Sequence, residues 1–507
     1  MKTNKIFFEA VLASVMAISS VSCDLNKYPD DAINTEDSME SAADCQSFLT
    51  GLYAGMKYCF TGYFIYIPEL QADSFHAVKN FGNYSGDYYS YSVTAGESTA
   101  NDVWYGLYGY IGNANFLIEG TQKLLGSGTL SEEDEVSVKE ILGEASYLRA
   151  HLYLLLAQYY CEDYDPSTSE EAMGVPVVTK YDPTGDSRKY PGRPSLETTY
   201  AQIVADIATA EEYVQTEGYQ NSPYVTKDVV TALKARVALL MHDYDTALIS
   251  AKSLIDGGNY TLCTDAAKFA DGWKNDNLTE TIWQVAMTGP DDIGNSFRYF
   301  IYNRSGVVGE DNPQYVPEDW VLNLYDQAND IRYSSWFSTR NISTPVSGRL
   351  TLMVKYPGNP KLYSTVTNYV NMPKVFRISE MYLIAAEAAS NKPGQETVAS
   401  YYLNALKSRR ISGWKDQDYS GTTLTNAIRD ERVRELFCEG QRLSDIKRWH
   451  IGFKRSAGQD PSLLMPGDNY VNASRPADDP FFLWPIPTAE MEANPQMKQN
   501  PAYTNSL

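Results

Sequence analysis

Apolar residues recur at intervals of three and four along much of the chain, a spacing that predicts amphipathic helices. The clearest stretch runs from Thr226 to Ile255 and carries two apolar stripes. The first stripe consists of Val229, Leu233, Val237 and Leu240, and the second of Leu248, Ala251, Leu254 and Ile255. The letters HDYD at 242–245 separate the stripes, and Gly257-Gly258 follows the second. This pattern predicts two antiparallel helices, with Thr226 as the N-cap of the first.

A second helix pair is predicted from Ile378 to Arg409, where the letters NKPG at 391–394 break the chain between two apolar stripes. Two longer helical stretches precede both pairs, around residues 103–120 and 138–160. The chain is therefore expected to be mainly α-helical.

The first pair resembles a tetratricopeptide repeat in one respect. Ala235 and Ala247 lie twelve residues apart, as do the two small residues that let the helices of such a repeat touch. Most other positions of the 34-residue pattern do not match, so the repeat is degenerate. Helix pairs of this kind stack on a shared core and form a curved scaffold.

Long segments without helical spacing separate these blocks, at residues 61–101, 161–195, 259–318, 338–374 and 450–507. They contain short β-like runs such as ETIWQVAM at 280–287. Irregular segments of this length are usually functional or wrap a scaffold. No Ser/Gly-rich linker and no charge run divides the chain, which predicts one domain over residues 23–507, with a helical scaffold and a loop-rich, partly β half.

The first 22 residues have the form of an export signal. Lys2 and Lys5 provide a positive start, and a stretch of apolar and small residues ends at Ser22. The stretch is too short to span a bilayer, so residues 1–22 are expected to be removed. The letters SSVSC resemble a lipobox, which predicts a lipid on Cys23 and attachment to a membrane. The alternative is an ordinary secretory signal that is cut nearby.

Composition excludes several classes of partner and cofactor. The net charge of −22 becomes −23 without the signal, which disfavours nucleic acid as a ligand. The remaining cysteines are Cys45, Cys59, Cys161, Cys263 and Cys438, with no CxxC spacing. They predict buried free thiols and neither a disulfide framework nor a sulfur-based metal site. The four histidines form no metal-ligand spacing, and no HExxH, GxSxG or Walker motif occurs, so no cofactor is expected.

The segment AIRDERVRELFCEGQRLSDIKRW, at 427–449, combines an apolar side with regularly spaced charges. Opposite charges lie three residues apart at Arg432 and Glu435, at Glu439 and Arg442, and at Asp445 and Arg448. That spacing makes them neighbours on a helix. No histidine or nucleophile stands beside them, which favours structural ion pairs over an acid/base site.

This segment resembles the C-terminal signature of the SusD/RagB family of outer-membrane nutrient-binding lipoproteins. Further blocks similar to the family follow one another in order: WYGLYGYIGNANFLIE, GEASYLRAHLYLLLAQYY with GVPVV, VTALKARVALLMHDYDTALISAKSLID, FRISEMYLIAAEAA and FLWPIP. The resemblance covers almost the whole chain from Cys23. It implies four tetratricopeptide-like helix pairs below a loop-rich face that binds oligosaccharides, or peptides in some branches. It also implies a place on the cell surface as a lid over a SusC-like TonB-dependent transporter barrel, with no covalent chemistry.

The tyrosines fit a sugar-binding face. The chain holds 39 Tyr and 17 Phe, and the polar stretch GNYSGDYYSYS at 82–92 contains four of the tyrosines. A tyrosine ring covers the apolar face of a sugar, and its hydroxyl can bond to the rim. In the family interval around 73–91, the expected stacking rings are Phe75, Phe81, Tyr84, Tyr88 and Tyr89. The expected polar contacts there are Asp73, Lys79 and Asn83. The alternative is that these rings pack the loop onto the scaffold.

A second interval, GNSFRYFIYN at 294–303, offers Arg298 and Tyr299 as ligand contacts. Trp320 could face the same cleft, although it equally fits a core position. Trp104, Trp283, Trp449 and Trp484 lie within family blocks and are expected in the core. Three functions remain open: a glycan-binding lipoprotein, a peptide-binding relative, and an exported glycoside hydrolase, for which no carboxylate pair stands out.

Overall fold

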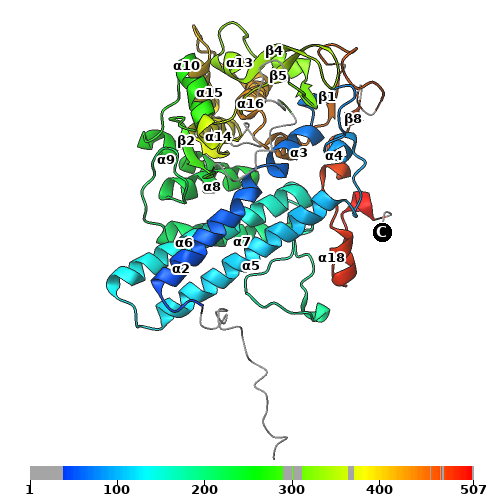
Figure 1. The fold of residues 1–507 in the computed structure, drawn as a ribbon. Coiled ribbons are helices and arrows are strands. Elements are labelled where there is room, and N and C mark those ends of the chain that lie inside the picture. The colour runs from blue at the N-terminus through cyan, green and yellow to red at the C-terminus, as the bar shows by residue number, and fades with distance from the viewer. Residues whose placement is uncertain are drawn as a thin grey trace, which may run out of the picture.

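Four long helices form the lower half of the molecule as it is drawn in Figure 1. The computed structural model describes residues 38–288, 300, 311–363, 370–456, 458–468, 470 and 473–504. The long helices are α2 (Ala42–Met56), α5 (Ser98–Gly126), α6 (Glu132–Tyr160) and α7 (Leu196–Tyr213). Helix α6 packs against the other three, and α2 also contacts α5. The predicted helices at 103–120 and 138–160 are confirmed as parts of α5 and α6.

Helix α6 illustrates how the sequence defines a helix start. The side chain of Ser131 accepts a hydrogen bond from the backbone N–H of Asp134, and the first turn carries four acidic residues. An N-cap hydroxyl satisfies a backbone donor that has no partner in the helix, and acidic groups favour the positive end of the helix dipole.

Both predicted helix pairs are confirmed. The first consists of α8 (Lys227–Leu240) and α9 (Tyr244–Gly257), with Thr226 as N-cap and Gly258 in the left-handed conformation at the end. Ala235 and Ala247, the two small residues that were expected to let the helices touch, are fully buried. The second consists of α14 (Ile378–Ser390) and α15 (Glu396–Arg410). Helices α9 and α14 pack against each other, so the two pairs stack directly although a long stretch of chain separates them.

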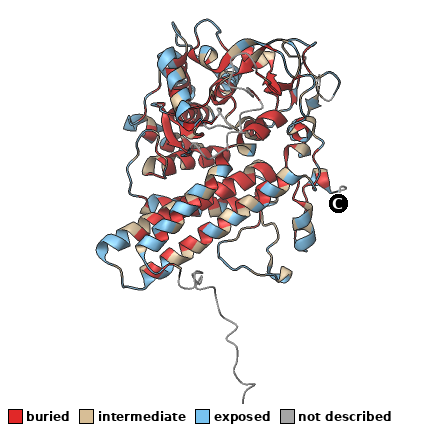
Figure 2. Ribbon diagram, viewed as in Figure 1, coloured by how far each residue is buried: buried red, intermediate tan, exposed pale blue. Residues whose placement is uncertain are grey.

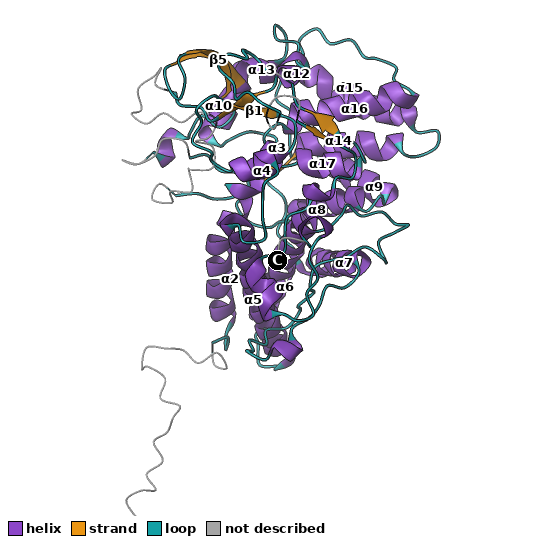
Figure 3. Cartoon of the chain, turned by 90° about the vertical axis from the view of Figure 1, so that its right-hand side faces the viewer, coloured by secondary structure: helices purple, strands orange, loops and turns teal. Residues whose placement is uncertain are grey.

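The strands and short helices gather at the other end of the molecule (Figure 3). Among the described residues, four two-stranded antiparallel sheets pair β1 (Phe75–Ala77) with β3 (Tyr315–Pro317), β2 (Thr281–Gln284) with β6 (Lys374–Arg377), β4 (Phe337–Ile342) with β5 (Gly348–Met353), and β7 (Phe453–Lys454) with β8 (Ser474–Arg475). The short helices here are α3 (Tyr63–Gln71), α4 (Gly86–Ser90), α10 (Ala266–Asn275), α12 (Asp319–Asn323) and α13 (Ile331–Trp336). Helix α18 (Thr488–Ala493) instead lies beside α5 (Figure 1). The predicted β-like run at 280–287 is confirmed in β2.

The buried residues form a core that runs through both ends (Figure 2). One apolar cluster includes side chains from α2 through to the C-terminal segment. The four tryptophans expected in the core are buried, and Trp273 and Trp336 join them. The five described cysteines are free thiols, of which all but Cys263 are buried.

The 427–449 segment is two helices rather than one. Helix α16 (Gly421–Leu436) ends before a turn, and α17 (Arg442–Arg448) begins after it. Gly440 has a φ of 77°, and a Cβ there would lie 2.6 Å from the backbone oxygen of Phe64, so the turn fits closely against α3. Because the helix breaks, several of its charges meet partners that the spacing along one helix does not predict.

The predicted structural ion pairs are present, but two of the three partnerships are wrong. Asp445 and Arg448 pair as predicted, at 2.8 Å. Arg432, however, binds Asp445 at 2.9 Å instead of Glu435. Glu439 binds Lys355 and Arg377, while its predicted partner Arg442 binds Asp73.

Glu435, on α16, lies at the centre of a buried ion-pair network. Its Oε1 accepts hydrogen bonds from Arg377 Nη1 at 2.7 Å and Arg410 Nη2 at 2.8 Å. Its Oε2 accepts from Arg332 Nη1 at 2.8 Å and Arg410 Nε at 2.9 Å. All four side chains are fully buried. The three arginines come from α13, the end of β6 and the end of α15, so one carboxylate joins three distant parts of the chain.

The network is balanced in charge. Its acidic members are Glu280, Asp330, Glu431, Glu435 and Glu439, and its basic members are Arg332, Lys355, Arg377, Arg410 and Arg434. Burial alone would raise the pKa of Glu435, but attraction to Arg410, Arg377 and Arg332 holds it well below its usual value. The carboxylate therefore stays charged inside the protein.

Replacing Glu435 by alanine is expected to lower the free energy of unfolding by about 3–5 kcal/mol, because three arginines lose a buried partner. Urea unfolding followed by circular dichroism measures the loss. The matched control is Glu211→Ala, which removes an exposed pair with Lys234 and should cost at most about 1 kcal/mol. Equal, small losses in the two variants would contradict the central role of Glu435.

Candidate functional site

The predicted ligand segment begins at Asp73, in the turn between α3 and β1. The Asp73 carboxylate accepts two hydrogen bonds from Arg442, from Nε and Nη2, both at 2.8 Å. Its backbone oxygen accepts one from Trp320 Nε1 at 2.9 Å. Asp73 is buried and Trp320 half-buried. Both were candidates for ligand contact, and here they hold the turn in place.

Three of the five expected stacking rings lie in the core. Phe75 is fully buried and stacks on Phe437, with ring centroids 5.0 Å apart. Tyr89 is also fully buried, beneath the Arg455 guanidinium at 3.7 Å from the ring centroid. Tyr88 is only 2% exposed. For these three rings the structure favours the alternative interpretation, in which they pack the segment onto the scaffold.

The other candidates from the segment lie at or near the surface. Lys79, Asn83 and Tyr84 are exposed there, Tyr84 by 42%, and Phe81 is half-buried. Tyr470, from a distant loop, packs its ring against Phe81 almost at a right angle, with centroids 6.2 Å apart. We call these five residues the aromatic face.

The aromatic face is fixed to the segment that precedes β3. The backbone N–H of Gly82 donates to the Gln314 side-chain oxygen. The Tyr315 hydroxyl donates to the backbone oxygen of Tyr84 at 2.7 Å. The chain at residue 79 also donates a backbone N–H to the carbonyl of Leu463, at 2.8 Å. Three separate segments thus meet beneath the exposed rings.

The backbone of this loop turns repeatedly through the left-handed region. Asn80, Asn83, Ser85 and Tyr91 have φ values of 62°, 55°, 52° and 59°. Such values are uncommon outside glycine and best tolerated by asparagine. Gly86 donates its N–H to Asn83 O at 3.1 Å, and a Cβ on Gly86 would lie 1.9 Å from Asn83 Oδ1. Backbone strain of this kind clusters at functional sites.

A buried histidine supports the face from below. His76, on β1, hydrogen-bonds through Nδ1 to Glu318 Oε1 at 2.9 Å and through Nε2 to the backbone oxygen of Met465 at 3.2 Å. The side chains of His76 and Glu318 are fully buried. Ser456 donates its hydroxyl to the other oxygen of Glu318 at 2.9 Å. The bonds of His76 to Glu318 and Met465, and of Glu318 to Ser456, connect β1 to the segment that leads to Tyr470.

Arg298 and Tyr299, the candidates from the second interval, lie outside the described residues, as does Cys23. Tyr470 was not among the sequence-based candidates. Its context, GDNYVN at 467–472, has the same mixture of Gly, Asn, Asp and Tyr as the stretch at 82–92. That composition was the signal that could have identified it.

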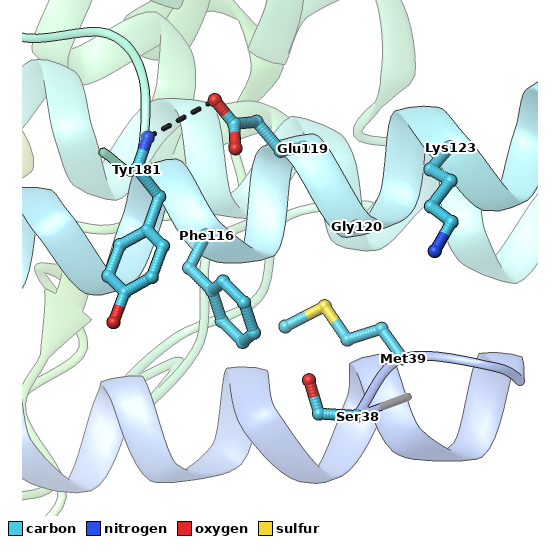
Figure 4. A pocket seen from close by; sticks show the side chains of 7 residues that line it. All are labelled: Ser38, Met39, Phe116, Glu119, Gly120, Lys123 and Tyr181. Carbon is cyan, nitrogen blue, oxygen red and sulfur yellow. Dashed lines mark hydrogen bonds between the residues drawn. The ribbon is translucent and has the colours of Figure 1, made fainter. Parts of the chain in front are cut away.

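A separate pocket lies at the far end of the long helices, where the described chain begins (Figure 4). It has a volume of about 310 Å³ and is lined by Ser38, Met39, Phe116, Glu119, Gly120, Lys123 and Tyr181. The rings of Phe116 and Tyr181 meet at a centroid distance of 4.9 Å. Glu119 Oε1 accepts the backbone N–H of Tyr181 at 3.1 Å, which ties the loop before α7 to α5. No sequence-based candidate lies in this pocket.

Two family models match this chain. One, described as the SusD family, matches residues 325–503, and the other, described as starch-binding associating with outer membrane, matches residues 25–239. Both describe SusD-like proteins, and together they span well over half of the chain. The chain belongs to the SusD family.

Relatives of known sequence or structure agree with this membership. The SusD-like protein P2 of Formosa agariphila is 24% identical, over 99% of this chain and 100% of the relative. A SusD superfamily protein from Bacteroides thetaiotaomicron has a TM-score of 0.76 and 25% identity, over 91% of this chain and 100% of its own. A laminarin-binding SusD-like protein has the same fold, with a TM-score of 0.66 and 19% identity, over 91% of this chain and 99% of its own.

The SusD family is one of carbohydrate-binding proteins, and its description includes association with the outer membrane. The mainly helical fold expected from the sequence is confirmed. In the described part of this SusD-family chain, no helix is both long and apolar enough to cross a bilayer. The same part contains no group of three or more His, Cys, Asp or Glu side chains placed to hold a metal ion.

Replacing Gly82 by alanine is expected to displace the Tyr84 ring, because the added Cβ would lie 2.7 Å from Tyr84 Cε2. A crystal structure of the variant would show the shift. Gly82 is exposed, so the free energy of unfolding should change by less than about 1 kcal/mol. The matched control is Gly96→Ala, whose Cβ would meet nothing within 4 Å. An unmoved ring in Gly82→Ala would show that the face is not packed as described.

Proposed function

We propose that this SusD-family protein binds oligosaccharide on the aromatic face and passes it to a SusC-like TonB-dependent transporter barrel. The observation that carries the proposal is the surface exposure of Tyr84 beside Phe81 and Tyr470, on a loop whose backbone is bonded to two other segments, at residues 314–315 and 463. Membership of a carbohydrate-binding family supports it. The protein is proposed to leave the bonds of its ligand intact.

The chemistry of the aromatic face suits a sugar. A pyranose ring has an apolar C–H face, which an exposed aromatic ring can cover, and a rim of hydroxyl groups. Tyrosine offers both an apolar ring and a polar hydroxyl at a low cost in conformational entropy. Lys79 and Asn83 lie exposed beside the rings and can donate hydrogen bonds to the rim. Arg298 and Tyr299 remain proposed contacts from the neighbouring interval.

Two alternatives remain. A peptide-binding relative would use the same face for aromatic or cationic side chains, which the net charge of −22 favours. An exported glycoside hydrolase would need two facing carboxylates near the sugar. The three candidates differ in ligand and in product, so one set of measurements separates them.

The decisive experiment measures oligosaccharide binding by calorimetry, with laminarin oligosaccharides as the first probe and a glycan array for breadth. Tyr84→Ala is expected to weaken binding by roughly 2- to 10-fold, because a stacked aromatic contact contributes about 0.5–1.5 kcal/mol. The matched control is Tyr401→Ala on α15, which removes an exposed ring far along the chain and should leave affinity unchanged. Chromatography of the incubated ligand should show no cleavage product.

Any other result would favour one of the alternatives or a different binding site. Peptide capture without glycan affinity would support the peptide-binding alternative, and released sugar would support the hydrolase. Equal losses in Tyr84→Ala and Tyr401→Ala would remove the aromatic face from the binding site. Full affinity in both variants would do the same.

We also infer that residues 23–507 form one domain and that residues 1–22 are a removed signal. The continuous apolar cluster supports the first inference. It predicts a single transition in the urea titration used for Glu435→Ala. A lipid on Cys23 would hold the protein at the outer membrane, facing the cell exterior. The fifteen residues from Cys23 to 37 can span at most about 50 Å, so a lipid on Cys23 would keep residue 38 within that distance of the membrane.

Cys23→Ala tests the anchor. Because acylation needs the thiol, the variant should leave the membrane fraction and appear as soluble exported protein, while the unaltered protein stays with membranes. Fractionation with detection by antibody measures this. Cys45→Ala is the control, since Cys45 is a buried thiol on α2. Membrane attachment that survives Cys23→Ala would support the ordinary secretory signal instead.

A further inference from the structure

Three buried polar atoms between α3, β1 and the α16–α17 helices have no hydrogen-bond partner among the described residues. They are Glu69 Oε2, Ser74 Oγ and Arg432 Nη1. The remaining polar atoms of Glu69 and Arg432 are bonded. Glu69 Oε1 accepts the backbone N–H of Gly440 at 3.1 Å, and Arg432 binds Asp445 through Nε and Nη2 at 2.9 and 3.0 Å. Leaving a buried polar atom without a partner is costly, so these three atoms need an explanation.

All three residues line one small cavity. It has a volume of about 10 Å³, and its other walls are Val433, Leu436, Phe437, Gln441, Arg442 and Asp445. That volume is close to the minimum that holds a single water molecule. Nothing larger than one small molecule or ion can enter without moving the core.

The charges around the cavity select a neutral occupant. The Arg432 guanidinium would repel a cation, and the Glu69 carboxyl would repel an anion when it is ionised. The three atoms are a donor (Arg432 Nη1), an acceptor (Glu69 Oε2) and a hydroxyl that can do either (Ser74). A water molecule can accept from the first, donate to the second and bond to the third.

We propose that this cavity is a binding site for one structural water molecule, hydrogen-bonded to Glu69 Oε2, Ser74 Oγ and Arg432 Nη1. Water also tolerates a change in the carboxyl group. Burial raises the pKa of Glu69 to about 7. When Glu69 is protonated, the water can accept from it instead of donating, so the site stays occupied on both sides of that pH.

The water would complete the support of the segment that leads to the aromatic face. Glu69 lies on α3, Ser74 lies next to the Asp73–Arg442 ion pair, and Arg432 lies on α16. The ion pair joins one side of the turn to α17, and the water joins the other side to α16. The turn into β1 is thereby held from two helices.

A crystal structure of the full mature protein at about 1.5 Å resolution tests the site directly. The expected result is one density peak within about 2.6–3.2 Å of all three atoms. The proposal is overturned if the cavity holds no peak, or if the three atoms bond directly to one another or to other protein groups.

The thermal stabilities of two variants at Ser74 test the water site independently of the crystal structure. Ser74→Ala keeps two partners for the water, whereas Ser74→Val fills the cavity and displaces it. In a hydrated site, Ser74→Val should unfold at a Tm at least about 1 °C below that of Ser74→Ala, because Glu69 and Arg432 lose their shared partner. In an empty site the order reverses, since added methyl groups fill unused space. A Tm of Ser74→Val equal to or above that of Ser74→Ala therefore contradicts the proposal.

Discussion

A single carboxylate, that of Glu435, constrains how α13, α15, α16 and the end of β6 can be arranged. Three arginines from distant elements converge on it, and all four side chains are excluded from water. Buried charges of this kind add little net stability compared with apolar side chains, but they tolerate almost no other arrangement, because any misplaced partner leaves an uncompensated charge. We infer that the network specifies the geometry of the fold, while the continuous apolar core supplies most of its stability.

The break between α16 and α17 connects that network to the candidate site. Within it, the backbone oxygen of Phe437 accepts a hydrogen bond from Lys355 Nζ at 2.7 Å, and the ring of Phe437 stacks on Phe75 of β1. Immediately after it, Arg442 binds Asp73. The same few residues thus contact the charged core and the strand that leads to the aromatic face. A continuous helix could not make both sets of contacts.

Much of the fold follows from local patterns in the sequence, whereas the site does so only in part. Thr226 and Gly258 mark the ends of the first helix pair because capping depends on neighbours in the chain. The partners of Arg432 and Glu439 could not be read from spacing, because Gly440 breaks the helix where α3 approaches. Tyr84 and Tyr89 stand in the same polar stretch, yet one is exposed and the other lies beneath Arg455. Composition made the segment a candidate, but only tertiary packing distinguishes rings that face solvent from rings that fill the core.

The stacking of α9 on α14 has a consequence for how such proteins diversify. The chain leaves the scaffold after α9 and returns at α14, and β2 pairs with β6 where this excursion starts and ends. Its two ends are therefore clamped together, and the entropy of closing a loop grows only slowly with its length. Residues can therefore be gained or lost in the loops of the excursion at small thermodynamic cost, outside the elements that carry Arg332, Trp336 and Lys355, while α9 and α14 stay packed together. Sequence variation can in this way accumulate in these loops on an unchanged helical frame.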